Sequence, residues 1–312
     1  MILVKKILVT FIKFLIAFGL LYWLFDSGKL DFSLILNLSP LYIIICFFVS
    51  LITIFFVSIR LKILLKGQNI ISNNFYLFKI SLIGLFYSTF LPGGISGDVI
   101  KSYYLLKYKK GDITKTPIFL TVIIDRLVGF HALVFLGFIS NIIALFLVTD
   151  QLKHFLNLSF WIFLTINICF LLLFNTKLFY TIFNFFKSKN ISILVKLFMA
   201  LEVFIKNRIV YVKSFFISIV TQILSICIIF LLMKSARIDI DYIYTTIISV
   251  YTFIINIAPI SPGGLGVGEI AFDNMLSIFT KQHNGASIFL AARIFYYIPS
   301  LIGIYYFIAM KR

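Results

Sequence analysis

The sequence predicts an all-α integral membrane protein with about six spanning helices and two re-entrant broken hairpins in an inverted repeat. Three observations support this fold class. The chain of 312 residues is 62% hydrophobic, with a mean hydropathy of +1.10, and is too apolar for a single soluble core. Several apolar runs reach the roughly 20 residues that a helix needs to cross a membrane. A Pro-Gly-Gly motif occurs at Pro92 and again at Pro262.

The apolar runs predict the spanning helices. The first run follows Lys5 and Lys6, as it would in a signal peptide. No small-residue cleavage site follows Phe25, so we interpret the run as a retained helix. The runs do not alternate in the way that barrel strands do. The six predicted spans are residues 7–25, 40–59, 116–148, 158–174, 214–233 and 286–309.

The basic residues predict the orientation of these spans. With a cytoplasmic N-terminus, Arg60 and Lys62 fall in an inside loop. A further span at 80–91 would export the lysines that follow it, against the tendency of cytoplasmic loops to carry Lys and Arg. We therefore predict a hairpin over 76–106 that enters from the cytoplasm. A second hairpin over 242–280 enters from outside, and both termini are then cytoplasmic.

This topology gives a single membrane domain over residues 1–312. Residues 40–148 form the first half-repeat and residues 214–309 the second, with opposite orientation, as in many transporters. Between them, residues 176–208 alternate basic residues with Phe, Leu and Ile. This pattern predicts amphipathic helices on the anionic cytoplasmic surface. An ordinary basic linker between the halves is the alternative.

The net charge of +17 is distributed by membrane side, which favours anionic lipid over nucleic acid as the partner. Cys46, Cys169 and Cys227 each lie alone in an apolar run and are interpreted as small buried hydrophobes. His131 is interpreted as a structural histidine. The sequence contains no nucleotide-binding, nucleophile or metal-binding motif, and we expect no enzymatic activity, cofactor or metal.

The repeated motif is the candidate binding site. Backbone that leaves the helix at membrane depth is tolerated only where protein or a water-filled cavity surrounds it. The glycines would free N–H groups at the start of the next helix, where an anion is favoured. The alternative is that they permit close packing or a kink. The candidate residues are Pro92, Gly93, Gly94, Pro262, Gly263 and Gly264.

Asp98 and Glu269 each follow a motif, near the start of the next helix. One interpretation is that they cap that helix by accepting backbone N–H groups. The other is that they bind an amine or a proton, since carboxylates at membrane depth usually face a cavity or a partner.

Two arginines are predicted to lie near the bilayer midplane. Arg126 and Arg293 follow the two prolines by 34 and 31 residues. Each must be paired there or must meet an anion, and a guanidinium suits a phosphate. Internal salt bridges are the alternative: Asp125 or Asp98 with Arg126, and Glu269 or Asp273 with Arg293. Lys101, Asp125 and Asp273 are the supporting charges.

These motifs resemble one known family. Pro92-Gly93-Gly94-x-x-Gly97-Asp98 is followed by Lys101 and the Tyr103–Leu106 segment, then by Asp125-Arg126-Leu127-Val128-Gly129 and by the second motif at 262–269. Together they are similar to the lysylphosphatidylglycerol synthase transmembrane region family, also called flippase-like or UPF0104. Asp125 departs from the Glu expected before the Arg, which shortens the side chain and keeps its charge.

The resemblance implies a lipid-flipping role. In longer members a soluble aminoacyltransferase domain follows the membrane domain, and no such domain is expected here. Other members are associated with archaeal lipid-linked glycans. We therefore expect a translocase of an anionic or aminoacylated phospholipid or of a polyprenyl-phosphate-linked lipid in the cell (inner) membrane, with a homo-oligomer as one assembly that we consider. A coupled transporter of a small solute, or an accessory protein or enzyme of lipid-linked glycan or aminoacyl-lipid synthesis, is the alternative.

Overall fold

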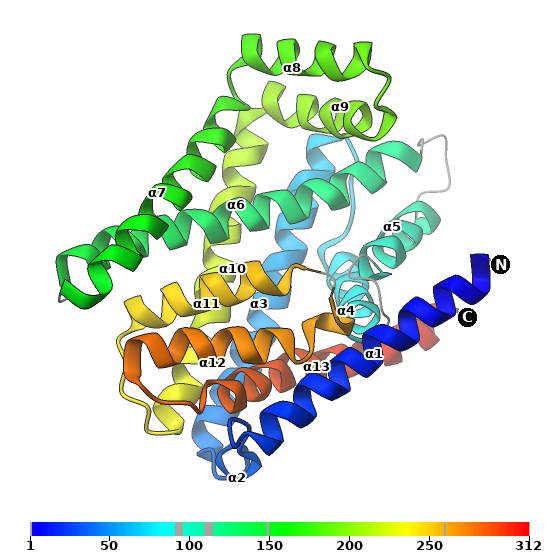
Figure 1. The fold of residues 1–312 in the computed structure, drawn as a ribbon. Helices are drawn as coiled ribbons and strands as arrows, with labels where there is room; N and C mark the ends of the chain where they lie inside the picture. The colour runs from blue at the N-terminus through cyan, green and yellow to red at the C-terminus, as the bar shows by residue number, and fades with distance from the viewer. Residues whose placement is uncertain (1, 91–95, 109–114, 148–149, 259, 312) are drawn as a thin grey trace. The chain divides into compact units, whose positions relative to one another are not determined.

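The computed structural model describes residues 2–90, 96–108, 115–147, 150–258 and 260–311. Within these residues the chain forms α-helices, one short 3-10 helix and no strand (Figure 1). Five helices of this described part are long and apolar enough to cross a membrane. The prediction of an all-α multi-pass membrane protein is therefore confirmed. The exact number of spans and the inverted repeat stay predictions.

Each predicted span corresponds to a helix, and several helices are longer than predicted, α3 and α7 by the most at one end. α3 extends eight residues beyond position 59, and α7 begins eight residues before position 158. The extension places Arg60 inside α3, which corrects its assignment to a loop. The helix continues because apolar residues resume directly after Arg60, up to Leu65. The helices are α1 (Ile2–Asp26), α3 (Pro40–Gly67), α6 (Lys115–Leu147), α7 (Asp150–Leu172), α10 (Arg208–Ser235) and α13 (Gly285–Lys311).

Each predicted hairpin consists of two short helices on either side of its motif. The first comprises α4 (Asn74–Phe90) and α5 (Ser96–Tyr108), and Pro92, Gly93 and Gly94 lie outside the described residues. The second comprises α11 (Tyr242–Asn256), the 3-10 helix η1 (Pro262–Gly264) and α12 (Val267–Thr280). The longest of the α-helices has 17 residues, or about 26 Å at 1.5 Å per residue. None of the four reaches the roughly 30 Å of the hydrocarbon layer.

The chain divides into two compact units. Unit 1 contains residues 1–53, 80–100 and 224–312, and unit 2 contains residues 54–79 and 101–223. The units differ from the predicted half-repeats because α3, α4, α5 and α10 each contribute to both.

In unit 1, α12 packs against both α11 and α13 (Figure 1). Small residues permit these contacts. A side chain at Gly285 would meet the Asp273 backbone at 2.7 Å, and one at Gly97 would collide with Gly84 of α4. Because lipid is as apolar as the side chains, close packing at small residues such as these glycines holds helices together in a membrane.

Unit 1 also contains a short helix, α2 (Phe32–Leu36). It is capped by Asp31, which accepts from the Ser33 N–H at 2.8 Å.

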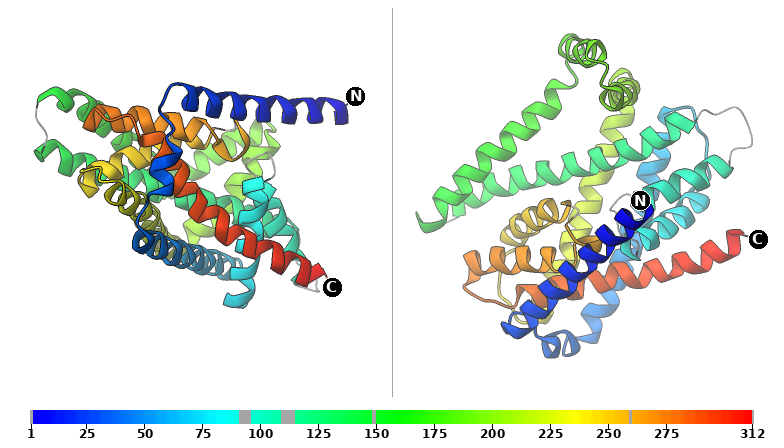
Figure 2. Two further views of the ribbon diagram at one scale, coloured as in Figure 1. Left: turned by 90° about the horizontal axis from the view of Figure 1, so that it is seen from below. Right: turned by 45° about the vertical axis from the view of Figure 1, so that its right-hand side comes forward.

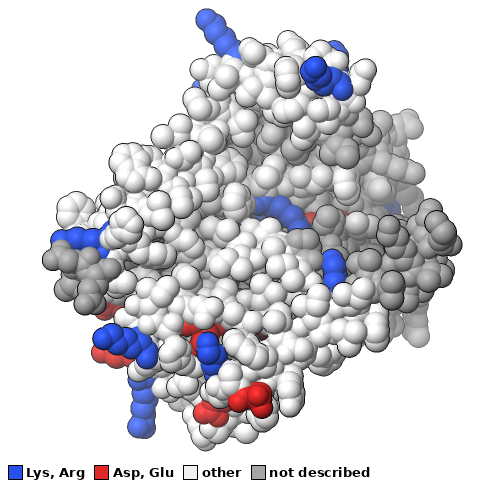
Figure 3. Space-filling model, in the orientation of Figure 1, with Lys and Arg blue, Asp and Glu red and all other residues white. Residues whose placement is uncertain are grey.

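In unit 2, α6 packs against α7, and α8 (Thr176–Ser188) packs against α9 (Ser192–Lys206). Figures 1 and 2 both show α8 and α9 side by side. Phe179 and Phe198 are buried between them, and the segment predicted to be amphipathic over 176–208 forms these two helices and the start of α10. Their place on a membrane surface stays a prediction. On the face drawn in Figure 3, uncharged side chains predominate and the basic side chains are scattered.

Candidate functional site

Unit 1 holds a buried arginine at the second Pro-Gly-Gly motif. Arg293 of α13 forms an ion pair with Glu269 of α12, with Nε and Oε1 2.5 Å apart. Its Nη1 donates to the Gly263 carbonyl at 2.5 Å and its Nη2 to the Gly264 carbonyl at 2.7 Å. Glu269 is fully buried, and Arg293 is 8% exposed. Of the two alternatives for Arg293, the structure therefore contains the salt bridge to Glu269.

The carboxylate of Glu269 also begins its own helix. Its Oε2 accepts the N–H of Gly266, three residues earlier, at 2.7 Å. This N–H has no partner within the helix, and the negative charge is favoured by the helix dipole. The interpretation of Glu269 as a helix cap is therefore confirmed. One carboxylate joins the start of α12 to Arg293.

The motif presents two carbonyl groups to Arg293, and one of the two glycine N–H groups expected to be free for an anion is engaged within the turn. The Gly264 N–H donates to the Ser261 carbonyl at 3.1 Å in the turn. Gly264 has φ +72°, and a side chain there would collide with Asn256. At Gly268, a side chain would meet Phe289 at 2.5 Å. The glycines thus allow both the left-handed turn and the close packing that we had considered as the alternative.

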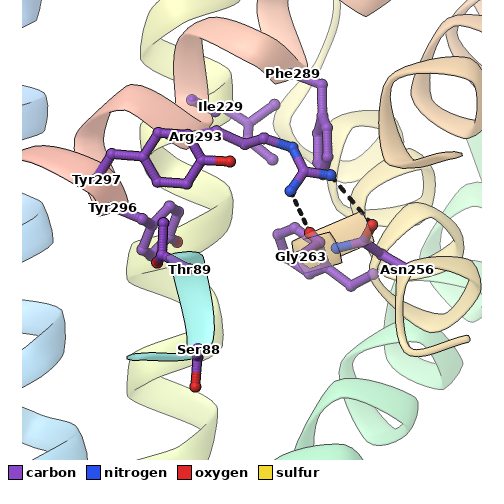
Figure 4. Close-up of a pocket in the computed structure, with 11 residues that line it drawn as sticks. Ser88, Thr89, Ile229, Asn256, Gly263, Phe289, Arg293, Tyr296 and Tyr297 are labelled. Atoms are coloured by element: carbon purple, nitrogen blue, oxygen red, sulfur yellow. Dashed lines mark hydrogen bonds between the residues drawn. The ribbon is translucent and has the colours of Figure 1, made fainter. Parts of the chain in front are cut away.

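A cavity of about 190 Å³ borders this arginine. Figure 4 shows Arg293 between Phe289 and Tyr297, with hydrogen bonds to Gly263 and Asn256. Polar groups enter the cavity from several helices, and the rest of its wall is aromatic or aliphatic. The volume exceeds that of several waters at about 30 Å³ each. The lining residues are Ser88, Thr89, Ile229, Phe253, Asn256, Gly263, Phe289, Ala292, Arg293, Tyr296 and Tyr297.

Unit 2 holds a different buried arginine. Arg60 donates from Nε and Nη2 to the two carboxylate oxygens of Asp125, at 2.6 and 2.9 Å. Its Nη1 donates to the Ser218 hydroxyl at 3.0 Å. Asp125, one of the two carboxylates suggested as a salt-bridge partner of Arg126, pairs with Arg60, and Arg126 is exposed. One residue along a helix rotates a side chain by about 100°, so Asp125 and Arg126 do not face the same neighbours.

Two other predicted residues have a definite position. Asp273 is buried and pairs with Lys29, with Nζ and Oδ2 3.2 Å apart, which corrects its suggested pairing with Arg293. It also accepts the Gly285 N–H at 3.0 Å.

Asp98 is 7% exposed in the first turn of α5, and Lys101 lies on the same helix. Among the described residues no three His, Cys, Asp or Glu side chains gather as a metal site.

The cysteines differ in exposure: Cys46 is buried, Cys227 is half-buried and Cys169 is exposed on α7. This corrects the expectation of burial for Cys169.

Sequence reasoning missed Asn256 and the cavity hydroxyls. Tyr296 and Tyr297 follow Arg293 by three and four residues, the spacing that places side chains on one helix face. Ser88 and Thr89 end an apolar helix directly before the first motif. Asn256 likewise ends the apolar run before the second motif. Polar residues at the ends of apolar helices next to a break were the available signal.

The sequence of this chain matches the lysylphosphatidylglycerol synthase transmembrane region family over residues 10–303. The chain belongs to this family. A UPF0104 membrane protein of Methanocaldococcus jannaschii is 26% identical over 303 residues, which cover 90% of this chain and 88% of the relative. No solved structure matches the chain. Membership in the lysylphosphatidylglycerol synthase transmembrane region family confirms the resemblance and supports a lipid-related function in the membrane.

Proposed function

We propose that this protein moves a lipid with a phosphate-containing headgroup between the two leaflets. The substrate is an anionic or aminoacylated phospholipid or a polyprenyl-phosphate-linked lipid. The observation that carries the proposal is the cavity of unit 1, a largely apolar space with a few polar groups, which borders Arg293 and the broken helix at Gly263. Irregular backbone in a membrane protein is tolerated where it lines such a cavity, and broken helices form the binding sites of many transporters.

The headgroup would bind through hydrogen bonds as well as charge. Arg293 is neutralised by Glu269, so a phosphate in the cavity meets a guanidinium whose charge is already compensated. Ser88 and Thr89 line the same cavity and carry hydroxyl donors. We propose that the phosphate accepts from these hydroxyls and from the guanidinium edge that faces the cavity, while the lipid tails stay in the bilayer.

Movement of the lipid would depend on the turn at Gly263 and Gly264. Their carbonyls accept from Arg293, and a phosphate that takes over these N–H donors would release the turn. In this proposal the ion pair with Glu269 persists during exchange.

The remaining features complete the proposal. The protein lies in the cell (inner) membrane with both termini in the cytoplasm, as the basic loops predict. Its partners are membrane lipids, mainly anionic, and nucleic acid is not among them. It transports without chemical conversion of the lipid. Arg126 remains a second candidate for phosphate contact, which Arg126→Ala tests.

Reconstitution in liposomes tests the proposal. Fluorescent phosphatidylglycerol in the inner leaflet is protected from dithionite, so the fraction bleached over time reports transbilayer movement. Wild-type protein should accelerate the movement. Ala292→Phe fills the cavity and should return the rate to that of protein-free liposomes. Thr89→Val keeps the side-chain shape, removes one donor and should lower the rate by a smaller factor.

The matched control is Ile298→Phe, which adds a ring to the same helix at a 41% exposed position. It should move lipid at the wild-type rate. The thermal unfolding temperature of each variant is measured first, and only variants that unfold at the wild-type temperature are compared. A blocked cavity is thereby distinguished from a loss of fold. Equal rates for Ala292→Phe, Ile298→Phe and wild type would contradict the cavity route. Parallel assays with lysyl-phosphatidylglycerol and a polyprenyl phosphate identify the preferred headgroup.

A further inference from the structure

Unit 2 contains a second cavity that the transport proposal does not use. It has a volume of about 250 Å³ and lies among α6, α7, α9 and α10. Engineered apolar cavities of about 150 Å³ are large enough to bind benzene. The lining residues are Ile124, Leu127, Val128, Phe170, Leu173, Phe174, Phe198, Leu201, Phe204, Ile205 and Tyr211.

Among the side chains that the structure describes, the cavity wall offers no polar contact to a ligand. Tyr211 carries the only hydroxyl among the lining side chains, and this hydroxyl is 2.7 Å from Nδ1 of His131. The His131 ring stacks on Phe170 at 4.3 Å, which fixes the pair in place. Water in a cavity needs two or more polar partners. The occupant that this wall favours is therefore an apolar chain.

A basic side chain lies at the edge of the same cavity. Nη2 of Arg208 donates to the carbonyl of Phe174, a lining residue, at 3.2 Å. Arg208 is exposed, so its guanidinium can also meet a group outside the cavity. Arginine at a membrane surface attracts anionic headgroups. An apolar cavity with an arginine at its edge complements a molecule that has an apolar chain and an anionic head.

The position of α9 gives this binding a structural role. Phe198, Leu201, Phe204 and Ile205 of α9 form part of the wall, while α6 and α10 supply residues on the other sides. An amphipathic helix is held at a membrane by its apolar face and by anionic lipid. A chain inside the cavity would contact the apolar face of α9 and fasten it to α6 and α10.

We propose that this cavity holds an acyl chain of an anionic phospholipid whose headgroup contacts Arg208. The bound lipid is a resident ligand of unit 2, separate from the lipid that unit 1 is proposed to move. Its binding does not depend on transport.

Photocrosslinking with the full-length protein tests this site. The probe is phosphatidylglycerol with a diazirine in the middle of one acyl chain, in nanodiscs, followed by digestion and mass spectrometry. Adducts should concentrate on peptides that contain Leu127, Phe170 and Leu201. Leu201→Trp fills the cavity and should abolish these adducts. Met199→Trp is the matched control, because Met199 lies on the same helix and is 49% exposed.

Leu127→Phe fills the cavity from α6 and replaces Leu201→Trp if the latter does not fold. Adducts spread evenly over lipid-facing peptides, or unchanged by both filling variants, would overturn the proposal. Arg208→Gln should lower the phosphatidylglycerol adducts about fivefold, the effect of one basic residue near an anionic surface, and should leave a diacylglycerol probe unaffected. Equal labelling of wild type and Arg208→Gln by the phosphatidylglycerol probe would overturn the assignment of the headgroup. A free fatty acid that labels wild type and Arg208→Gln equally well would also overturn it.

Discussion

The two units each bury an arginine beside a carboxylate, and they use the pair differently. In unit 2, Arg60 gives two of its donors to Asp125 and one to Ser218, all between side chains of regular helices. In unit 1, Arg293 pairs with Glu269 and also holds the carbonyls of a broken helix. Arg60 links side chains of neighbouring helices, whereas Arg293 donates hydrogen bonds to backbone carbonyls at a break between helices.

This difference distinguishes a pair packed between helices from a pair that borders a cavity. Gly129 of α6 lies against the Arg60 side chain, because a Cβ added there would be 3.0 Å from Nη1 of Arg60. The backbone of α6 therefore packs against that side of the guanidinium. Arg293 faces a cavity. A packed pair can be replaced by apolar side chains of similar volume, while a guanidinium that satisfies backbone carbonyls has no apolar substitute.

The largest effect is expected when one partner of either pair is removed. Glu269→Leu and Asp125→Leu each leave a buried guanidinium without its counter-charge, which costs about 3–5 kcal/mol. Glu269→Leu also removes the cap of α12, worth about 1 kcal/mol. Thermal unfolding in detergent should therefore rank Glu269→Leu below Asp125→Leu, and both far below wild type. A loss under 1 kcal/mol for both would show that neither pair is buried in the folded protein.

Replacing both members of each arginine–carboxylate pair by apolar residues should affect the stability of the two units differently. Arg60→Met with Asp125→Leu removes charge and counter-charge together, and its stability should lie within about 1 kcal/mol of wild type. Arg293→Met with Glu269→Leu leaves the Gly263 and Gly264 carbonyls without donors, at about 1–3 kcal/mol for each buried group. The second double variant should therefore stay unstable. In liposomes the first should still move lipid and the second should not.

Recovery of both double variants, or of neither, would contradict the distinction between the pairs. The two single changes Arg60→Met and Arg293→Met complete each cycle. The interaction energy of each pair can then be separated from the loss of either side chain alone.

Alanine at a glycine next to each arginine should give a smaller contrast. Gly268→Ala places its new carbon 2.5 Å from the Phe289 ring and 2.7 Å from Arg293 Nη2, and such overpacking costs about 1–3 kcal/mol. Gly129→Ala meets only Arg60, at 3.0 Å, and gains about 0.5–1 kcal/mol from the helix preference of alanine. We expect Gly268→Ala to lower the unfolding temperature and Gly129→Ala to leave it nearly unchanged. An equal shift for both would remove the contrast.

The sequence predicted the helices well because apolar length and helix-breaking motifs are local properties. The helices on either side of the first motif extend two residues beyond the predicted bounds at each end, and those around the second motif have the predicted bounds. Glu269 and Arg293 were predicted as a possible pair because both are charged residues in apolar surroundings, and burial of charge demands a partner.

The partners that were missed depend on tertiary structure. Asp125 and Arg60 are 65 residues apart, and nothing local distinguishes Arg60 from the lysines that follow it in α3. The choice between Asp125 and Arg126 depends on which helix face is turned inward, and the apolar residues surround both of them. The hydrogen bonds from Arg293 to the Gly263 and Gly264 carbonyls depend on the geometry of the turn. The Pro-Gly-Gly motif predicts a turn, but it does not determine whether carbonyl or N–H groups face the arginine.

An exposed ion pair gives the smallest effect and sets the scale for the buried ones. In α9, Glu202 accepts from Lys206 at 2.7 Å and from Tyr180 at 2.8 Å, and these bonds lower the pKa of Glu202 below its ordinary value of 4.5. Its contribution to stability is therefore present above pH 4.5 and is lost as the pH falls through the lowered pKa. Thermal unfolding of wild type and Glu202→Gln should differ slightly at pH 7 and converge near pH 3. A difference at pH 7 as large as that for Asp125→Leu would mean that exposure does not weaken the pair, against the expectation for solvent-screened charges.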